Sequence, residues 1–427
     1  MSDDLLARHR AVLPSWLTLY YDDPLEIVSG SGRRVTGADG REYLDFFAGI
    51  LTNMLGYQVP EVRAAVDRVL DRGVVHTSTL YLIREQVELA ERIAELSGIP
   101  DAKVFFTSSG TEANEMALLL ATQARRSTQV LAIRNSYHGR SFAAMGITGI
   151  RGWSASALSP VSVSYVYGGY RYRSPWRDLP DADYIDACAR DLRDVIDSTT
   201  AGDVACLIAE PIQGVGGFAV PPDGFFGALK AVLDEYGILL VSDEVQTGWG
   251  RTGEHFWGIG AHGVTPDIMT FAKGLGNGLA IGGVVAPGEL MDGIPANSIS
   301  TFGGNPLATA GARATLDYVL EHDLQANALK VGTRLLTGLR DLGAEHEVVG
   351  DVRGKGLMAA LELVRPGGDT PDPAAAARLM EETRAGGLLV GKGGRFGNVL
   401  RIAPPLTLTE AEADEGLGVL RDSLAAL

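Results

Sequence analysis

Short apolar runs alternate with segments of helical periodicity between residue 103 and about residue 290. The runs are KVFF, VLAI, CLIAEPI, ILLVSDEV, IMTFA and GGVVA. Runs of this length, bounded by polar and glycine-rich turns, are typical of buried strands. Their alternation with helical stretches predicts a doubly wound α/β fold, with a central, mostly parallel sheet and helices on both faces. Ligands bind such open sheets at the carboxyl ends of the strands.

The segments outside this region predict a second, smaller α+β lobe. Residues 14–48 break short apolar stretches with Gly-Ser-Gly and Ala-Asp-Gly, which favours a meander of strands. Residues 60–72 and 305–345 have helical periodicity, and 346–427 mixes strand and helix patterns. Residues 151–182 are irregular and predict a long loop. The expected boundaries are 1–65 for the N-terminal part of the small lobe, 66–325 for the large domain and 326–427 for the C-terminal small domain.

Composition excludes several function classes. The chain has 427 residues, 37 basic and 53 acidic, with a net charge of −16, so we expect more than one domain and no nucleic-acid partner. Cys188 and Cys206 lack the spacing of a zinc site or a disulfide framework, and we expect no metal. MSDDLLARHR at the N-terminus resembles no targeting peptide, and no apolar run is long enough to span a membrane. We therefore expect a cytoplasmic protein without membrane partners.

An acid and a lysine end two consecutive apolar runs. Asp243 closes GILLVSDEV, and Lys273 follows IMTFA. Parallel strands bring such ends to one sheet edge, where a lysine can form a Schiff base with a cofactor aldehyde and the acid can hold a ring nitrogen protonated. The pair indicates pyridoxal 5′-phosphate. The alternative is an ordinary loop lysine, but the chain has only six lysines and the apolar flank favours a functional one.

Two hydroxyl-bearing turns are candidate phosphate contacts. Ser109, Gly110 and Thr111 stand where KVFF passes into a helical segment, and a helix N-terminus offers free N–H groups to an anion. A plain helix cap is the alternative. Thr301 lies in STFGGNP beside two glycines, and a polar turn is the alternative there.

Three further polar residues follow or lie within apolar runs. Tyr137 and His138 come after VLAI, where an aromatic ring can stack on a flat cofactor, unless the two simply pack in the core. Glu210 ends CLIAEPI, and Arg401 lies between apolar residues in LRIAPPL. A buried arginine needs an acid or a ligand carboxylate, so Glu210 and Arg401 are a candidate pair that opens for a substrate.

The motifs together resemble a known family. SGTEAN, YHG, EPIQG, DEVQTGWGRTG, DIMTFAKG, TFGGNP and LRIAPPL occur in that order and resemble the class III (omega-type) aminotransferases of pyridoxal-phosphate fold type I, from about residue 16 to the C-terminus. PLEIVSG, FFAGI, HTSTLY, EHFWG, AKGLGNG, VVGDVRGKGLM and GLLVGKGG look most like the alanine–glyoxylate aminotransferase subgroup. The resemblance implies ping-pong transfer from an amine or ω-amino acid to a 2-oxo acid such as pyruvate or glyoxylate. It also implies a homodimer with the active site at the subunit interface.

The resemblance assigns roles to the candidate residues. Lys273 would form the Schiff base and carry the proton, and Asp243 would pair with the ring nitrogen. Gln246 would bond the phenolic oxygen, Val245 would pack under the ring, and Thr301 would reach the phosphate of the other subunit. The implied cofactor-binding set is Ser109, Gly110, Thr111, Tyr137, His138, Asp243, Val245, Gln246, Lys273 and Thr301, and the substrate-binding set is Glu210 and Arg401.

The resemblance leaves the amine donor open. Many relatives read GHxHP where this chain reads Gly-Tyr-Gln-Val-Pro over 56–60, near the expected substrate entrance. Aminomutases, epimerases and decarboxylating transaminases use the same scaffold and remain alternatives. A non-catalytic scaffold protein is a further alternative, which the intact Lys273, Asp243 and Gln246 argue against.

Overall fold

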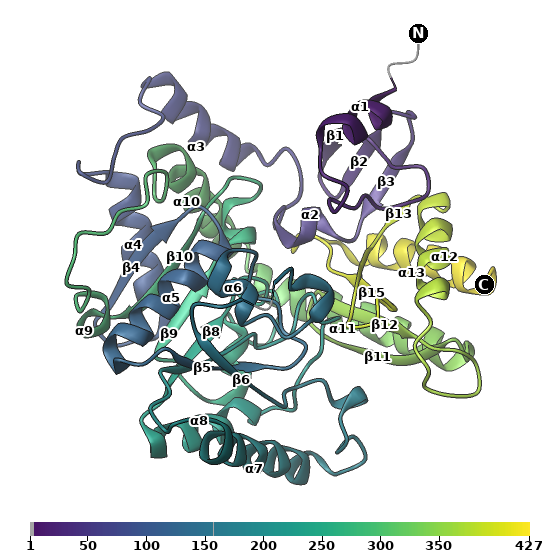
Figure 1. The fold of residues 1–427 in the computed structure, drawn as a ribbon. Coiled ribbons are helices and arrows are strands. Elements are labelled where there is room, and N and C mark those ends of the chain that lie inside the picture. Colours follow the sequence, from purple (N-terminus) through teal and green to yellow (C-terminus); the bar gives the residue numbers. More distant parts are fainter. Residues whose placement is uncertain (1–3, 157) are drawn as a thin grey trace.

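A seven-stranded sheet forms the centre of the large lobe in this computed structural model, which describes residues 4–156 and 158–427 (Figure 1). Its strand order is β4-β10-β9-β8-β7-β5-β6. The run from β6 through β5, β7 and β8 to β9 is parallel, while β10 is antiparallel to both β9 and β4. The strands are β4 (Ala102–Thr107), β5 (Gln129–Ile133), β6 (Ser162–Val166), β7 (Cys206–Ala209), β8 (Leu239–Asp243), β9 (Ile268–Phe271) and β10 (Gly282–Pro287).

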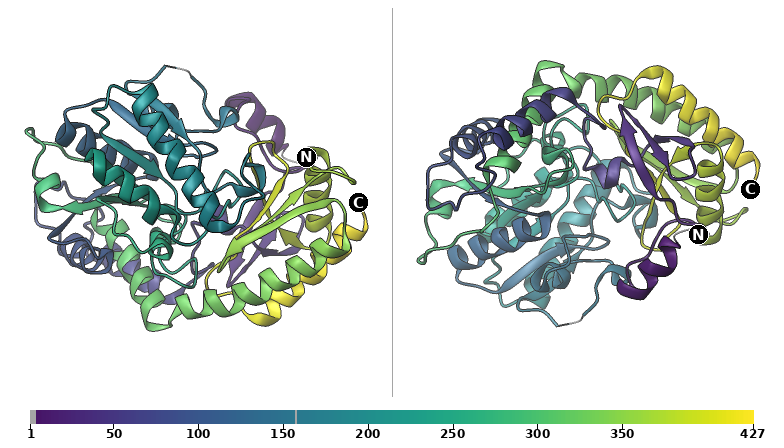
Figure 2. Two further views of the ribbon diagram at one scale, coloured as in Figure 1. Left: turned by 90° about the horizontal axis from the view of Figure 1, so that it is seen from below. Right: turned by 90° about the horizontal axis from the view of Figure 1, so that it is seen from above.

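Apolar side chains project from both faces of this sheet, and helices cover both faces because these side chains must be buried. In β5, Val130 and Ala132 join an apolar cluster with α5, whereas Leu131 and Ile133 join another with α7 and α8. This period-two alternation places successive side chains on opposite faces. The predicted mostly parallel sheet with helices on both faces is confirmed (Figure 2). The helices named here are α5 (Gly110–Arg125), α7 (Asp181–Thr199) and α8 (Phe225–Tyr236).

Three more helices close the outer flank of the large lobe. α3 (Pro60–Asp71) has Pro60 in its first turn, where the missing N–H costs nothing. α10 (Pro306–Glu321) packs on α3 and on α4 (Arg84–Ser97). The predicted helical stretch 305–345 is two helices, because Asp323 takes a left-handed conformation and caps the second, α11 (Leu324–Glu345).

The small lobe joins the two ends of the chain. β1, β2 and β3 form an antiparallel meander. β3 also pairs in parallel with β13, with Leu44 opposite Leu388. A second sheet has the order β11-β12-β15-β14. Figure 1 shows the purple N-terminal strands beside the yellow C-terminal elements. The bounds are β1 (Ile27–Ser31), β2 (Arg34–Gly37), β3 (Glu42–Asp45), β11 (Val349–Lys355), β12 (Met358–Leu363), β13 (Leu388–Leu389), β14 (Gly391–Gly393), β15 (Val399–Ile402), α1 (Leu5–Val12), α2 (Ala48–Leu51), α12 (Pro373–Ala385) and α13 (Glu410–Ala425).

The prediction of a loop over 151–182 was wrong in part. Residues 162–166 form β6, an edge strand parallel to β5. Val163 and Tyr165 of this strand pack on one apolar cluster and Val166 on the other, and its backbone groups pair with those of β5. Within 4–156 and 158–427, no helix has the length and apolar character needed to cross a membrane.

Candidate active site

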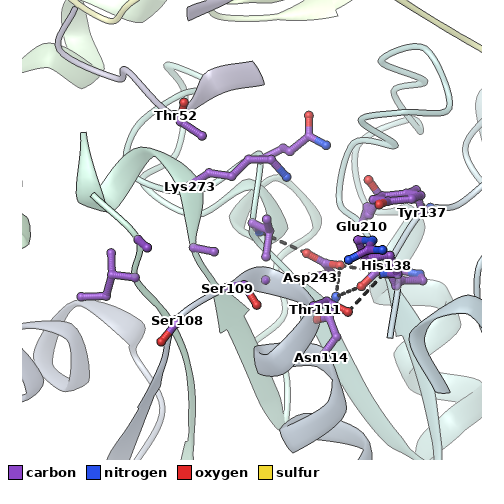
Figure 3. A pocket seen from close by; sticks show the side chains of 18 of the residues that line it. Thr52, Ser108, Ser109, Thr111, Asn114, Tyr137, His138, Glu210, Asp243 and Lys273 are labelled. Atoms are coloured by element: carbon purple, nitrogen blue, oxygen red, sulfur yellow. Dashed lines mark hydrogen bonds and ion pairs between the residues drawn. The ribbon is translucent and has the colours of Figure 1, made fainter. Parts of the chain in front are cut away.

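A cavity of about 390 Å³ opens at the carboxyl ends of the central strands (Figure 3). Its walls come from the turns after β4, β5, β7, β8 and β9, the sheet edge that the alternating pattern predicted. Figure 3 shows Lys273 between Thr52 and Asp243. The predicted residues that line the cavity are Ser109, Gly110, Thr111, Tyr137, His138, Glu210, Asp243, Val245, Gln246 and Lys273.

Asp243 is buried and held by three neighbours. Its Oδ2 accepts a hydrogen bond from Nδ2 of Asn114 at 2.8 Å and lies 2.8 Å from Nδ1 of His138. Its Oδ1 accepts from the backbone N–H of Val245 at 3.1 Å. Asn114 in turn accepts from the Thr270 hydroxyl at 2.7 Å. His138 therefore orients the acid, in addition to lying beside the ring position that the sequence suggested.

Lys273 begins a short 3₁₀ turn directly after β9. Its φ of 45° is a left-handed conformation, which strains a residue with a side chain and is typical of functional positions. Loss of hydration in the cavity lowers the pKa of the Lys273 amine, while the charges of Asp243 and Glu210 oppose the change and Arg401 adds to it. A lysine with a lowered pKa supplies a neutral, nucleophilic amine nearer to neutral pH.

The N-terminus of α5 faces the same cavity. Ser109 is the N-cap, and its hydroxyl accepts from the backbone N–H of Glu112 at 3.4 Å. The Thr111 hydroxyl accepts from the backbone N–H of Ser141 at 3.1 Å. A side chain at Gly110 would meet Val245 at 3.1 Å, so the helix start lies tightly against the turn after β8. The same turn can therefore cap α5 and still offer backbone N–H groups to an anion.

Glu210 is bonded to the backbone and forms no ion pair with Arg401. Its Oε1 accepts from the N–H of Tyr137 at 2.9 Å, and its Oε2 accepts from the N–H of Gly214 at 2.7 Å. Burial raises the pKa of the Glu210 carboxyl to about 7, and the nearby Asp243 acts in the same direction while His138 opposes it. The carboxylate serves here as an acceptor for two strand-end turns.

Arg401 is buried, is not among the residues that line the cavity, and has no acid partner among the described residues. Its Nε donates to the carbonyl of Lys392 at 3.2 Å, and its Nη1 donates to that of Gly214 at 3.4 Å. The guanidinium lies 4.9 Å from the ring centre of Phe47. Burial lowers the pKa of the Arg401 guanidinium, while Tyr20 and the charge of Glu210 oppose the change.

Thr301 and the Gly-Tyr-Gln-Val-Pro stretch lie away from the cavity. Thr301 is exposed and lines a separate hollow with Ser300 and Phe302. The Tyr57 hydroxyl donates to Asp45 at 2.6 Å, and its ring packs against the backbone of β1. The chain's own fold thus brings neither Thr301 nor Tyr57 to the walls of the cavity.

Several site residues were not assigned from the sequence. Asn114 lies within SGTEAN, one helical turn beyond the candidate phosphate-binding turn, and this spacing could have indicated that its side chain faces the site. Thr270 lies inside the apolar run IMTFA, and no feature of the sequence indicates that it belongs to the site. Thr52, Ser108 and Ile281 also line the cavity.

The residues present fit pyridoxal 5′-phosphate. A buried acid, a lysine amine and a helix N-terminus surround one cavity, as the ring nitrogen, aldehyde and phosphate of that cofactor require. The buried Oε1 of Gln246 has no hydrogen-bond partner among the described residues, so this amide is available to a ligand. No cluster of metal ligands occurs among residues 4–156 and 158–427.

Curated relatives span almost the whole chain. Alanine–glyoxylate aminotransferase 2 homolog 2 of Arabidopsis thaliana is 40% identical over 97% of this chain and 85% of its own length. Human alanine–glyoxylate aminotransferase 2 is 35% identical over 98% and 86%. An alanine/serine racemase of Pyrococcus horikoshii is 34% identical over 99% and 90%.

Solved structures and a family model agree with these relatives. An (S)-enantioselective omega-transaminase from Thermomicrobium roseum has a TM-score of 0.91 at 34% identity, covering 100% of this chain and 98% of that one. An amine transaminase from an uncultivated Pseudomonas species, solved with bound pyridoxal phosphate, has a TM-score of 0.89 at 34% identity over 95% of each chain. The model of the class-III aminotransferases matches residues 20–424. The chain therefore belongs to the class III aminotransferases, enzymes of pyridoxal-phosphate fold type I that depend on pyridoxal 5′-phosphate.

Proposed function

We propose that this aminotransferase moves an amino group from an amine or ω-amino acid to a 2-oxo acid in a ping-pong cycle, with pyruvate or glyoxylate as acceptor. The arrangement of Asp243 and Lys273 around one cavity carries the proposal, because the cycle needs both groups. The names of the relatives support the substrate class: two are alanine–glyoxylate aminotransferases, and a 5-aminovalerate aminotransferase of Pseudomonas aeruginosa is 37% identical over 99% of the chain.

Lys273 and Asp243 have the central roles in this proposal. Lys273 would hold the cofactor through its amine, and the same amine would move a proton to and from the substrate carbon. When bound, the cofactor supplies an electron sink. Asp243, held by Asn114 and His138, keeps the ring nitrogen protonated so that the sink stays effective. Burial and the fixed orientation of the carboxylate spare it reorganisation during the reaction.

Four groups of residues would position the cofactor and substrate. The Ser109–Thr111 turn would hold the phosphate, with the α5 dipole behind it. Tyr137 would stack on the ring, Val245 would pack on its other face, and the free amide of Gln246 would bond the phenolic oxygen.

Arg401 is the proposed carboxylate site for the oxo acid. It has no acid partner in the part of the chain that the structure describes, and Glu210 is occupied by two backbone N–H groups, so no internal pair has to open first. An arginine in a water-poor setting binds a carboxylate strongly, since charge-assisted hydrogen bonds gain strength there.

A homodimer completes the proposed site. Leu82 is 98% exposed and Phe302 is 63% exposed, and Phe302 contacts the ring of His76 at 5.1 Å. Leu80 lines a hollow with Ile299, and Ile299 lines the next hollow with Thr301 and Phe302, so the exposed Leu80, Ile299 and Phe302 form an apolar surface of the kind that marks protein interfaces. Thr301 lies within this surface and outside its own cavity, which favours a role in the site of a second copy. A cytoplasmic location remains a prediction from the sequence.

The racemase relative favours one alternative, an amino-acid epimerase on the same scaffold. An epimerase inverts the substrate carbon and needs no oxo acid, whereas a transaminase stops after one amine until an oxo acid is supplied. The two functions therefore differ in their dependence on an amino acceptor.

Titration of the holoenzyme with amines, in the absence of any oxo acid, tests the proposal. The panel is L-alanine, β-alanine, 3-aminoisobutyrate, 4-aminobutyrate, ornithine and taurine. We expect one class of donor to replace the visible band of the lysine-bound cofactor by the band of its amine form, and pyruvate or glyoxylate to restore it. Inversion of an amino acid without that spectral change would instead establish the epimerase.

A further inference from the structure

A second cavity, of about 730 Å³, lies beside the candidate active site. Four arginines line it, Arg134, Arg151, Arg173 and Arg395. No aspartate or glutamate is among its described lining residues. In a chain with 53 acidic and 37 basic residues, such a concentration of positive charge is a local exception.

Three of these arginines retain free charge. Arg134, Arg151 and Arg395 are exposed and form no ion pair with a described residue. Arg173 differs, because Glu362 lies 2.8 Å from its Nη2. An unpaired guanidinium offers five N–H donors and keeps its charge at any physiological pH, so the cavity has donors in excess of acceptors.

Aromatic contacts hold part of this charge in place. The guanidinium carbon of Arg134 lies 4.0 Å from the ring centre of Tyr167, which itself packs edge-on against Trp176 at 4.8 Å. Stacking on a ring restrains the guanidinium and leaves its in-plane N–H groups free. A ligand therefore meets a partly ordered donor set, which lowers the entropy lost on binding.

The two cavities share a wall. Thr148 lines the second cavity, and its hydroxyl accepts from the backbone N–H of His138 at 3.2 Å. The ring of Tyr137, in the first cavity, meets that of Trp153 at 5.5 Å, in the loop that carries Arg151. The arginine-lined cavity thus adjoins the turn that carries Tyr137 and His138, the residues expected to flank the cofactor ring.

We propose that the arginine-lined cavity binds a small, multiply charged oxyanion, a phosphorylated or polycarboxylated molecule. Guanidinium groups match phosphate and carboxylate oxygens in bidentate geometry, and several of them select for more than one negative charge. The ligand is either the distal end of a long substrate or a separate small molecule, and the chemistry of recognition is the same. The proposal does not depend on the reaction performed in the neighbouring site.

Calorimetry on the holoenzyme, with pyrophosphate and citrate as probes, tests this site. We expect saturable binding that weakens with added salt. In the double variant Arg134→Gln/Arg395→Gln we expect binding at least about 10-fold weaker, since each lost charge-assisted bond contributes on this scale. Arg421→Gln, an exposed arginine on α13, should bind as the wild type does. Absence of saturable binding to the wild type, or equal affinity in the double variant, would overturn the proposal.

A second titration separates the two sources of ligand. Binding of pyrophosphate is measured with and without a saturating amine from the donor panel. A weaker affinity in the presence of the amine would make the cavity the distal part of the substrate site. An unchanged affinity would make it a separate effector site. Both outcomes uphold the oxyanion site, and the binding measurement itself needs no turnover, so failure of the proposed transamination leaves it interpretable.

Discussion

Asn114 donates a hydrogen bond of 2.8 Å from its Nδ2 to Oδ2 of Asp243. Asn114 belongs to α5, the helix whose first turn faces the cavity as a candidate phosphate cradle. One rigid helix therefore sets the position of the cradle relative to the acid. Thr270 of β9 fixes the other end of the Asn114 amide, at 2.7 Å, and so ties α5 to the sheet.

Replacement of Asn114 tests this link. Asn114→Ala leaves a buried carboxylate oxygen with one donor fewer, which costs about 1–3 kcal/mol. We expect kcat to fall by about 5- to 150-fold on that scale, with a smaller change in the KM for the amine. Steady-state kinetics on the cofactor-loaded variant provide the measurement. Gln123→Ala, on the exposed side of the same helix, is the matched control, and equal kcat values in the two variants would contradict the role.

Lys273→Ala should remove the visible absorption band of the lysine-bound cofactor and abolish turnover. The reason is that no other lysine lines the cavity among the described residues, so no amine is positioned to take its place. Absorbance spectra after reconstitution provide the measurement. Lys230→Ala, a lysine paired with Asp234 on α8, controls for general loss of a lysine. A variant that kept the band would show that Lys273 does not attach the cofactor.

Glu210 predicts a pH dependence of stability. Burial raises its pKa from about 4.5 to about 7 in the folded protein, so the folded state binds more protons than the unfolded state between these values. The contribution of Glu210 to the free energy of unfolding is therefore fully present below about pH 4.5 and is lost as the pH rises through about 7. Glu210→Gln cannot ionise, and it leaves one of two backbone donors unpaired.

We accordingly expect Glu210→Gln to melt below the wild type at pH 5 and to lose part of that deficit by pH 8, a range chosen to bracket a pKa of about 7. Thermal melts of the apoprotein across this range provide the measurement, because no cofactor equilibrium then contributes. Asp267→Asn, at a half-buried acid outside the cavity, is the control. A deficit that stayed constant between pH 5 and pH 8 would show that the Glu210 carboxyl is already ionised in the folded protein at pH 5.

Thr301→Ala tests the contribution of a second subunit. If Thr301 donates to the phosphate of the other copy, its loss should weaken cofactor binding by about 1–3 kcal/mol, the range for one hydrogen bond to a charged group. Equilibrium dialysis of the cofactor gives the affinity, and light scattering gives the assembly state. Ser298→Ala, three residues earlier in the same exposed segment, is the control. Unchanged cofactor affinity in a dimeric Thr301→Ala protein would exclude the contact.

The continuous apolar runs were sufficient to predict the central strands, because a strand buried within a sheet that is covered on both faces carries adjacent apolar side chains. β4, β5, β7, β8, β9 and β10 all fall on predicted runs. The edge strand β6 was missed, since the serines in SVSYV interrupt its apolar residues and leave no continuous apolar run. Edge strands are recognised by their pairing partner, which lies elsewhere in the chain.

The sequence by itself determined which polar groups stand at the strand ends: Asp243, Lys273, Glu210 and the Ser109 turn each follow an apolar run, and parallel pairing brings such ends to one edge. Only the tertiary structure decided their hydrogen bonds. Asn114 meets Asp243 across 129 residues of chain, and Glu210 meets Tyr137 across 73. It also placed Thr301 outside its own cavity. Local sequence patterns encode which face a residue occupies, whereas partners between distant segments depend on how the packed layers are superposed.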